Sequence, residues 1–386
     1  MHAHRKAQMG IKMKRLLYLT TWDFSDGASS GITNKIKAQM KAFESYGFLV
    51  DYTCISNGKT ILCKDGQSVS LGRVGKFRKL AANFYLTKRL KQENYDYIYS
   101  RYGLADVFYL KLLKIFAKKN AKIVVEIPSY PYDKECMPGI VWWMLYALDK
   151  ACRRKLGLYV NRIATYSEDK YIFNIPTINI YNGIDFSTVK IREPMEPEPM
   201  DGIHLIAVAA FAKWHGYDRL LVGLGEYYSK APQRRVIFHL VGDGAVRKEY
   251  EEIVSKYNIQ PYVIFHGMKF GKELDELYNL CDIGVENLGF HRSGIYHEST
   301  LKSREYGAKG LPFITSCIVD GFNDAEFVLK FQPNENSIDV EKIVMFYDLM
   351  YNGVKKEKIA SDIRKLAEQK CSMKQVIEPI VNYYQE

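Results

Sequence analysis

Lysine, glutamate and hydroxyl side chains are concentrated in residues 297–314, with the sequence HESTLKSREYGAKGLPFI. Ser299 or Thr300 can cap a helix, because a side-chain oxygen at that place accepts from free amides of the first turn. Lys302 would lie in that turn, so its ammonium group, the amides and the positive end of the helix dipole converge on one point that suits a diphosphate. Glu305 shares the helical face of Lys302, where a carboxylate can accept from two vicinal hydroxyls, such as those of a ribose. A plain surface Lys/Glu pair is the alternative.

Two glycine-containing turns follow apolar runs and precede predicted helices. In DGASSG, residues 26–31, Gly31 lets the backbone approach a ligand at a helix N-terminus. In HLVGDG, residues 239–244, Gly242 belongs to a second turn of this kind. Neither matches a dinucleotide-binding or P-loop fingerprint, so each alone also fits an ordinary connection between a strand and a helix.

Strands and helices alternate along the whole chain. We predict strands over residues 15–21, 48–55, 95–100, 122–127, 162–167 and 178–183, and then over 203–210, 235–244, 262–267, 282–287 and 311–316. We predict helices over residues 32–46, 76–93, 104–119 and 139–155, and then over 217–228, 246–257, 272–280 and 300–309. This alternation indicates an α/β fold with parallel sheets, helices on both faces and ligands at the carboxyl ends of the strands.

The chain of 386 residues is long enough for two domains. Residues 192–202, REPMEPEPMDG, contain three prolines and three glutamates without apolar periodicity, which indicates a stiff linker. We therefore expect two doubly wound, Rossmann-like domains over residues 13–190 and 203–365.

Charge is distributed unevenly between the two halves. Residues 1–185 hold 30 Lys and Arg against 15 Asp and Glu, whereas the rest of the chain holds 25 against 29. A basic half suits nucleic acid, an anionic membrane surface or a phosphorylated ligand, and an ordinary solvated surface is the alternative. No helix-turn-helix, RNP-like or zinc motif accompanies the charge, which argues against nucleic acid.

The remaining composition predicts a cytoplasmic protein. The longest apolar run, Ile140 to Leu148, is too short to span a bilayer, and no separable leader precedes the first strand. The seven cysteines include no C-x-x-C pair, which fits a reducing compartment. The stretches 107–119 and 140–155 are basic and amphipathic. Because Trp142 and Trp143 cannot both face one core, contact with an anionic membrane is favoured over two purely sheet-packing helices.

The segment LKSREYGAKGLPFI resembles the donor-site helix of GT-B glycosyltransferases of the large retaining, nucleotide-sugar-dependent group (family 4-like), with the pattern E-x7-E-x-x-A-x-G-x-P. The segments SSGITNKIKAQMKAFESYG, NGID, HLVGDG and VIFHGMKFGKELDELYNLCDIGV are similar to further parts of these enzymes in the same order. EIPSYPYDKE and AKWHGYDRLLVGL resemble a bacterial branch that builds capsular or exported polysaccharide. The resemblance implies two Rossmann-like domains facing across a cleft, with a C-terminal helix over 366–386 that crosses back to the first.

This resemblance implies retaining transfer of a sugar from a nucleotide sugar, a UDP-sugar above all, to a hydroxyl of a growing, lipid-linked surface polysaccharide. The first domain would hold the acceptor and the second the nucleotide. Lysine and helix amides replace a metal ion in this group and no D-x-D triplet occurs here, so no metal and no cofactor are expected. The protein would work in the cytoplasm, with peripheral contact to the inner face of the plasma membrane. A nucleotide-sugar-binding regulator without turnover is the alternative.

The resemblance also assigns residues. The first glutamate of the pattern falls on His297, and the adjacent Glu298 can fill that role after a shift of one residue. A glycine–arginine pair that neutralises the diphosphate is replaced by Ala209 and Ala210, so lysines and arginines elsewhere must supply the charge. The predicted catalytic residues are His297, Glu298, Lys302 and Asp133. The predicted donor-binding residues are Gly31, Lys213, His215, Gly242, Arg292, Ser299, Thr300, Leu301 and Glu305. The predicted acceptor-binding residues are Tyr130, Tyr132 and Arg101.

Overall fold

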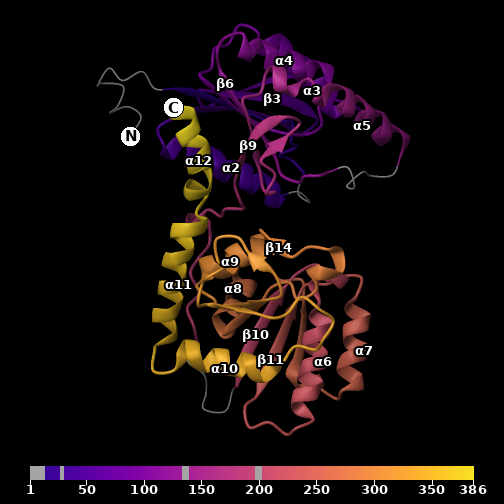
Figure 1. Cartoon of the computed structure of the whole chain (residues 1–386), viewed down its shortest axis with the longest axis vertical. Coiled ribbons are helices and arrows are strands. Elements are labelled where there is room, and N and C mark those ends of the chain that lie inside the picture. Colours follow the sequence, from indigo (N-terminus) through magenta and orange to yellow (C-terminus); the bar gives the residue numbers. More distant parts are fainter. Residues whose placement is uncertain (1–13, 27–29, 133–138, 196–201) are drawn as a thin grey trace. The chain divides into compact units, whose positions relative to one another are not determined.

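The structure, a computed structural model, describes residues 14–26, 30–132, 139–195 and 202–386 of the chain. They form two compact units, one of Met1–Tyr181 with Met373–Glu386 and one of Asn182–Ser372 (Figure 1). We call them unit 1 and unit 2.

The boundary between the units lies earlier than the proline-rich segment suggested. Arg192 is 3% exposed and holds its segment to unit 2. Its Nε, NH1 and NH2 donate to Gly310 O, Cys281 O and Tyr351 OH at 3.2, 2.7 and 2.8 Å. Residues 182–195 therefore belong to unit 2, and the stiff linker expected over 192–202 is anchored at its beginning.

The sheet of unit 1 has a parallel centre with antiparallel edges. Its order is β4-β3-β2-β1-β5-β6-β7-β9-β8, and the strands from β2 to β9 in this order pair in parallel. The strands are β1 (Arg15–Leu19), β2 (Leu49–Ser56), β3 (Lys59–Lys64), β4 (Gln67–Arg73), β5 (Tyr97–Arg101), β6 (Lys122–Ile127), β7 (Arg162–Thr165), β8 (Tyr171–Ile172) and β9 (Ile175–Asn179).

The antiparallel strands β3 and β4 were missed by the sequence prediction. Two tight turns produce them: Asn57 and Gly58 have φ of 48° and 68°, and Asp65 and Gly66 have φ of 51° and 78°. Asn-Gly and Asp-Gly are the dipeptides that favour two-residue hairpin turns, because both central residues need positive φ. The signal was therefore present in the sequence, although β4 is largely exposed and lacks an apolar run.

Helices cover both faces of this sheet. The helices are α2 (Ser30–Ser45), α3 (Arg78–Leu90), α4 (Val107–Ala117), α5 (Ile140–Arg153) and α12 (Met373–Gln385). Leu16 and Tyr18 of β1 pack with α2 and α12, whereas Leu17 and Leu19 pack with α3 and α4. This alternation follows from the two-residue period of a strand, and it makes β1 a central, fully covered strand.

Unit 2 contains a parallel sheet with the order β12-β11-β10-β13-β15-β17. Its strands are β10 (Ile203–Val208), β11 (Val236–Val241), β12 (Val263–Gly267), β13 (Ile283–Val285), β15 (Phe313–Thr315) and β17 (Val328–Lys330). Numbered within the unit, this is the 3-2-1-4-5-6 order of a doubly wound sheet, whose direction of winding reverses between β10 and β13. Ligands bind such sheets at the carboxyl ends of the strands beside this switch point.

The helices of unit 2 also form two layers (Figure 1). They are α6 (Tyr217–Tyr228), α7 (Arg247–Lys256), α8 (Gly271–Leu280), α9 (Leu301–Lys309), α10 (Val340–Tyr351) and α11 (Lys356–Cys371). The core that Leu205 and Phe238 enter includes residues of α6, α7 and α10. Short strands β14 (His297–Glu298) and β16 (Ile318–Val319) pair in parallel beside the main sheet. The single helix expected over 366–386 is two helices, because the backbone of Ser372 is extended (ψ 145°) between α11 and α12.

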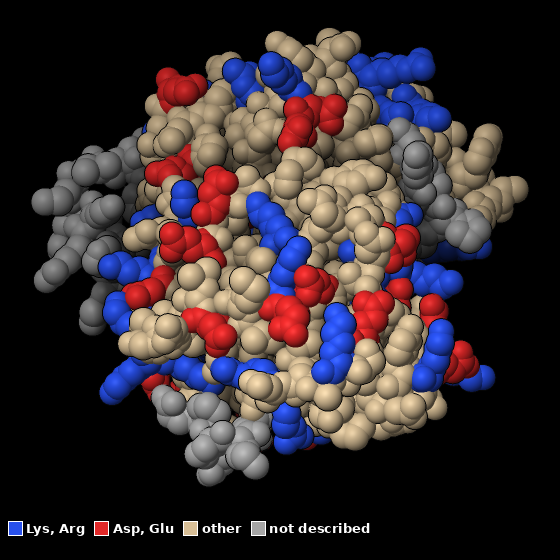
Figure 2. Space-filling view, turned by 60° about the horizontal axis from the view of Figure 1, so that its bottom comes forward, with Lys and Arg blue, Asp and Glu red and all other residues tan. Residues whose placement is uncertain are grey.

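No helix in the described ranges is both long and apolar enough to cross a bilayer. Helix α5, which contains the longest apolar run of the sequence, has 14 residues. On the face of the protein drawn in Figure 2, basic and acidic side chains are interspersed among uncharged ones.

Three histidines form a row across neighbouring strands of unit 2. His204 Nδ1 and His239 Nε2 are 2.8 Å apart, and His239 Nδ1 and His266 Nε2 are 2.9 Å apart. Burial, together with the two neighbouring imidazoles, lowers the pKa of His239 from 6.5 to about 3. His239 is therefore neutral in the folded protein over a pH range in which an unfolded chain would protonate it.

We expect the histidine row to make the free energy of unfolding depend on pH. Because the unfolded state binds the extra proton, the free energy of unfolding should fall as the pH drops from about 6.5 towards 3, by up to about 1.4 kcal/mol per pH unit for His239. The variant His239→Asn should flatten this dependence in urea unfolding. The control Ile237→Val changes the same face of β11 and should lower stability equally at every pH. A His239→Asn profile as steep as that of the native chain would contradict the assignment.

Candidate functional site

The segment 297–314 begins at the switch point of unit 2. Glu286 and Asn287 follow β13 directly, the turn Lys213–His215 follows β10, and α9 starts at Leu301. Lys302 of α9 contacts Glu286, Asn287 and Tyr217, and Leu288 N donates to His215 O at 2.8 Å, so these segments form one polar cluster. The carboxyl ends of β10 and β13 therefore contribute polar groups to the site together with α9, as the prediction of Lys213 and His215 implied for β10.

Lys302 is the centre of this cluster. Its Nζ lies 2.8 Å from Glu286 Oε2 and donates to Asn287 Oδ1 at 2.9 Å and to Tyr217 OH at 3.2 Å. The side chain of Lys302 is 18% exposed and that of Glu286 is fully buried. Burial alone would lower the pKa of Lys302, but the Glu286 carboxylate more than offsets this effect and holds the pKa above its ordinary value. Lys302 is thus a permanent, fixed cation.

Glu298 is a second buried carboxyl group in the cluster. It accepts from Asn287 Nδ2 at 2.8 Å and from Thr315 Oγ1 at 3.2 Å. Burial, with the neighbouring charge of Glu286, raises the pKa of Glu298 to about 8. Its carboxyl group therefore keeps its proton at neutral pH and can donate a hydrogen bond to an oxygen of a ligand.

Thr300 caps α9 and ties the helix to the cluster. Its side chain accepts from the backbone N–H of Ser303 and donates to Glu286 Oε1. The Ser299 hydroxyl instead accepts from Asn182 N at 2.8 Å and from Arg304 NH2 at 3.2 Å. Of the two candidate caps, Thr300 has this role and Ser299 binds to the scaffold.

His215 supplies a neutral donor beside Lys302. The Ala212 N–H donates to His215 Nδ1 at 3.1 Å, which leaves the ring proton on Nε2. Burial, followed by the charge of Lys302, lowers the pKa of His215 to about 3. The ring stacks on Tyr217 at 5.3 Å between centroids. Lys213, two residues before His215, is exposed.

Arg292 does not offer a free donor in the described structure. Its guanidinium forms a bidentate pair with Asp218 at 2.9 and 2.7 Å, contacts Glu335 from Nε and NH2, and donates to Lys213 O at 2.8 Å. All five N–H groups are accounted for by these acceptors. Arg292 therefore positions the loop of Lys213 in this structure, and the diphosphate contact predicted for it requires that one of these acceptors yield its place.

Glu305 points to a different part of unit 2 from Lys302. Its carboxyl group is hydrogen-bonded to Tyr278 of α8, and burial raises its pKa although Lys309 opposes the shift. The side chains of Lys302 and Glu305 share a helical face by spacing, but the partners of Lys302 follow β13 and begin α6, whereas that of Glu305 lies on α8. A ribose role for Glu305 requires that Tyr278 yield its place to hydroxyl groups.

The remaining predicted residues of unit 2 lie in β14, at the start of α9 and directly after β11. His297 and Leu301 are exposed, and Leu301 is the first residue of α9. Gly242 directly follows β11 and has a φ of 124°, and a Cβ there would lie 1.9 Å from Ala209 O. No larger residue fits this position, because the ends of β10 and β11 approach each other too closely.

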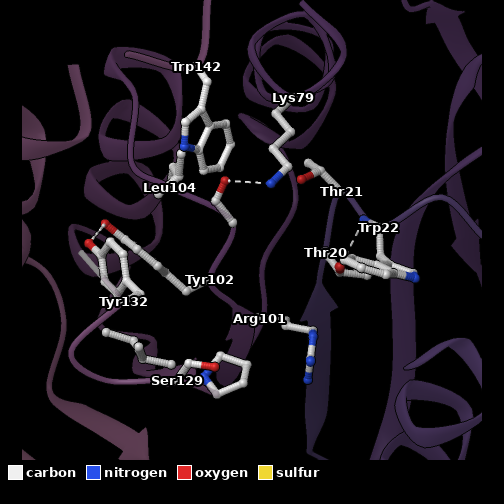
Figure 3. A pocket seen from close by; sticks show the side chains of 13 residues that line it. Thr20, Thr21, Trp22, Lys79, Arg101, Tyr102, Leu104, Ser129, Tyr132 and Trp142 are labelled. Atoms are coloured by element: carbon white, nitrogen blue, oxygen red, sulfur yellow. Dashed lines mark hydrogen bonds between the residues drawn. The ribbon is translucent and has the colours of Figure 1, made fainter. Parts of the chain in front are cut away.

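Unit 1 has a pocket of about 320 Å³ at the carboxyl ends of β1, β5 and β6 (Figure 3). It is lined by Thr20, Thr21, Trp22, Lys79, Arg101, Tyr102, Gly103, Leu104, Ile127, Pro128, Ser129, Tyr132 and Trp142. The predicted acceptor residues Arg101 and Tyr132 are among these. Tyr130 is not, and packs edge-on against Phe173 at 5.9 Å. Gly31 is exposed in the first turn of α2, and Asp133 lies outside the described residues.

Several residues of both sites were not predicted from the sequence. Glu286, Asn287 and Tyr217 in unit 2, and Trp22 and Lys79 in unit 1, are the main ones. A signal existed for the first two, because DIGVEN places a polar pair directly after a buried strand. Within the described ranges, no group of three or more histidine, cysteine, aspartate or glutamate side chains is arranged to hold a metal ion.

The chain is similar to solved structures of glycosyltransferases. A glycosyltransferase from Rickettsia africae has a TM-score of 0.62 at 14% identity, over 97% of this chain and 98% of that one. Anabaena Alr3699/HepE, solved in complex with UDP, has a TM-score of 0.56 at 14% identity, over 97% and 100%. The lipopolysaccharide outer core galactosyltransferase WaaB has a TM-score of 0.55 at 13% identity, over 96% and 100%. No family model and no curated protein sequence matches the chain.

The chain has the GT-B fold. The similarity covers both units and nearly the full length of each of these structures. At this level of identity it establishes the fold, which the strand orders of the two sheets also express.

We expect the cap of α9 to contribute measurably to stability. Replacing Thr300 by Ala removes the acceptor for Ser303 N and should lower the free energy of unfolding by about 1 kcal/mol, within the usual range of 0.5–2. Thr300→Ser keeps the oxygen and is the matched control. Equal urea midpoints for the two variants would show that the hydroxyl does not stabilise the helix.

Proposed function

We propose that the protein is a retaining glycosyltransferase that moves a sugar from a nucleotide sugar, most suitably a UDP-sugar, to a hydroxyl of a growing, lipid-linked surface polysaccharide. The observation that carries this proposal is the fixed cation Lys302 in the first turn of α9, at the switch point of a Rossmann-like unit. A cation, free helix amides and a dipole end suit a diphosphate. Alr3699/HepE, which shares the fold, was solved with UDP.

The residues of unit 2 fit the needs of the reaction. The bond from the anomeric carbon to the diphosphate breaks, and a bond from the same carbon to the acceptor oxygen forms on the same face. The acceptor proton passes to the leaving phosphate. Lys302, the exposed Lys213 and the amides of α9 stabilise the negative charge on the leaving diphosphate, which is the largest contribution that such a site can make.

Neutral donors complete the donor site in this proposal. His215 Nε2–H and the protonated Glu298 would bind oxygens of the sugar or the phosphates without adding charge. His297 lies next to Glu298 and is exposed, so it would be accessible to a bound sugar. Glu305 would hold the ribose hydroxyls.

Unit 1 would bind the acceptor in the pocket that Arg101 and Tyr132 line. Aromatic walls with a few polar groups suit a saccharide. WaaB, one of the structures with this fold, is described as acting on the lipopolysaccharide outer core. By analogy we propose a surface polysaccharide of the capsular or exopolysaccharide kind as the product, made in the cytoplasm.

Replacing Glu305 tests the nucleotide assignment. Glu305→Ala and Glu305→Gln should each weaken UDP-sugar binding or lower turnover at least about tenfold, equivalent to about 1.4 kcal/mol. The exposed Glu252→Ala is the matched control and should change neither. Kinetics unchanged in folded Glu305 variants would remove this residue from the site. Activity that disappears in EDTA and returns with Mn²⁺ would contradict a metal-free diphosphate site.

The alternative function, a nucleotide-sugar-binding regulator, gives a different result in the same assay. It would bind UDP-sugars with the same dependence on Glu305, but it would release no UDP with any acceptor. Nucleotide release measured with a panel of acceptor saccharides therefore separates the two.

Helix α5 supports a peripheral contact with an anionic membrane. Trp142 lines the pocket of unit 1. Three other apolar side chains of the same helix are exposed, namely Ile140 (78%), Trp143 (69%) and Met144 (56%). Exposed Lys150 and Arg154 follow on α5 and at its end. An apolar helix face beside basic residues suits the interface of an anionic bilayer.

Vesicle binding tests this contact. Lys150→Gln, Arg154→Gln and Lys155→Gln together should weaken binding to anionic vesicles by up to about 1 kcal/mol per residue near the surface, and salt should weaken it further. Lys248→Gln, Lys256→Gln and Lys272→Gln make the same charge change on exposed lysines of unit 2 and should have little effect. Equal binding of the native chain to neutral and anionic vesicles would contradict the contact.

A further inference from the structure

Positive charge is in excess around the pocket of unit 1. The charged residues among the described residues that line it are Lys79 and Arg101, and both are basic. Two buried carboxylates, Glu126 and Asp149, lie next to these lining residues, and each interacts with two cations.

Glu126 is fully buried at the end of β6. Arg101 NH1 donates to its Oε1 at 2.8 Å, and Lys35 Nζ lies 3.9 Å from the same oxygen. Hydroxyl groups of Tyr99 and Tyr166 also donate to it, at 3.0 and 2.8 Å. Burial alone would raise the pKa of Glu126, but Arg101 and Lys35 hold it below its ordinary value. Burial lowers the pKa of Lys35 to about 8, so it stays largely protonated at neutral pH and this group carries one net positive charge.

Asp149 of α5 is also fully buried and is already saturated with donors. It accepts from Ala105 N at 2.7 Å and from Tyr132 OH at 2.8 Å, and Tyr102 OH donates to it as well. Arg153 NH1 lies 3.5 Å from it. Lys79 interacts with Asp149 only at longer range.

Lys79 itself has a neutral hydrogen-bond partner in the described structure. Its Nζ donates to the carbonyl oxygen of Gly103 at 2.9 Å (Figure 3). Burial lowers its pKa, and the distant Asp149 only partly opposes that shift. Burying an ammonium group at a pocket wall without a carboxylate in hydrogen-bond contact lowers the stability of the folded protein. Binding of an anion would compensate for this loss.

Two further donors at the pocket lack acceptors. The indole N–H groups of Trp22 and Trp142 are buried and have no hydrogen-bond partner within the described residues. Both side chains belong to the pocket wall. Their nitrogen atoms have essentially no accessible surface and do not face the open pocket, so they offer no donor to a ligand there, and Lys79 remains the polar group that the pocket presents.

We propose that this pocket binds a saccharide that carries a negatively charged group, phosphate or carboxylate, with Lys79 as the direct partner of the anion. The inference rests on the proposed function in one respect, namely that unit 1 holds the acceptor, and it adds the chemical class of that acceptor. The pocket of about 320 Å³ is large enough for a charged sugar ring, and Tyr102, Tyr132 and Trp142 supply apolar surface for its ring faces.

Calorimetric titration of the full chain tests the proposal with glucose, glucose 6-phosphate, glucuronate and inorganic phosphate as probes. At least one of the charged sugars should bind about tenfold or more tightly than glucose. Lys79→Gln should abolish this preference, so that the charged sugars bind no more tightly than glucose. Lys76→Gln, an exposed lysine three residues earlier, is the matched control and should keep the preference.

The pattern of ligands identifies the source of the anion. Stronger binding of glucose 6-phosphate assigns a phosphorylated acceptor, stronger binding of glucuronate assigns an acidic sugar, and both support the proposal. Equal affinity of the native chain for glucose and both charged sugars overturns it without any variant, as does binding of inorganic phosphate as tight as that of the charged sugars. UDP binding, measured in the same samples, tests the donor site of unit 2. If UDP does not bind, the proposed function is contradicted, but a preference of the pocket in unit 1 for charged sugars would still be supported.

Discussion

The ion pair of Lys302 with Glu286 is the interaction on which the candidate donor site depends. A lysine in the first turn of α9 is close to the positive end of the helix dipole, which by itself disfavours the cation. Glu286, fully buried after β13, compensates for this charge and also accepts from the helix cap Thr300. Strand end, helix cap and lysine are therefore fixed by one carboxylate, and a displacement of β13 or α9 would disturb all three.

The same pair determines the protonation of its neighbours. The negative charge of Glu286 helps to keep Glu298 protonated, and the positive charge of Lys302 helps to keep His215 neutral. The cluster therefore contains one compensated ion pair surrounded by neutral donors. Because Glu298 is protonated, Glu286 is the one charged carboxylate in this cluster. A bound diphosphate would therefore not be repelled by a second carboxylate.

The charges are balanced differently in the candidate site of unit 1. There the two buried carboxylates are each surrounded by two cations and by tyrosine hydroxyls, so the pocket is left with positive charge. Both candidate sites lie at carboxyl ends of parallel strands, but unit 2 has a cluster of balanced charge and unit 1 a pocket with excess positive charge. The excess of basic residues in the first half of the sequence is thus partly a property of a buried site.

The sequence by itself determined what depends on local spacing. The alternation of strands and helices, a cap at Ser299 or Thr300 and the place of Lys302 follow from periodicity and from backbone amides a few residues away. The two hairpin turns of β3 and β4 correspond to Asn-Gly and Asp-Gly in the sequence, although the strands themselves were not predicted. Only the tertiary structure decided which side chains are free. Arg292 is paired with Asp218 and Glu335, Glu305 is hydrogen-bonded to Tyr278, and Trp142 lines a pocket while Trp143 is exposed. These partners come from distant segments, and spacing within one helix carries no information about what packs against it.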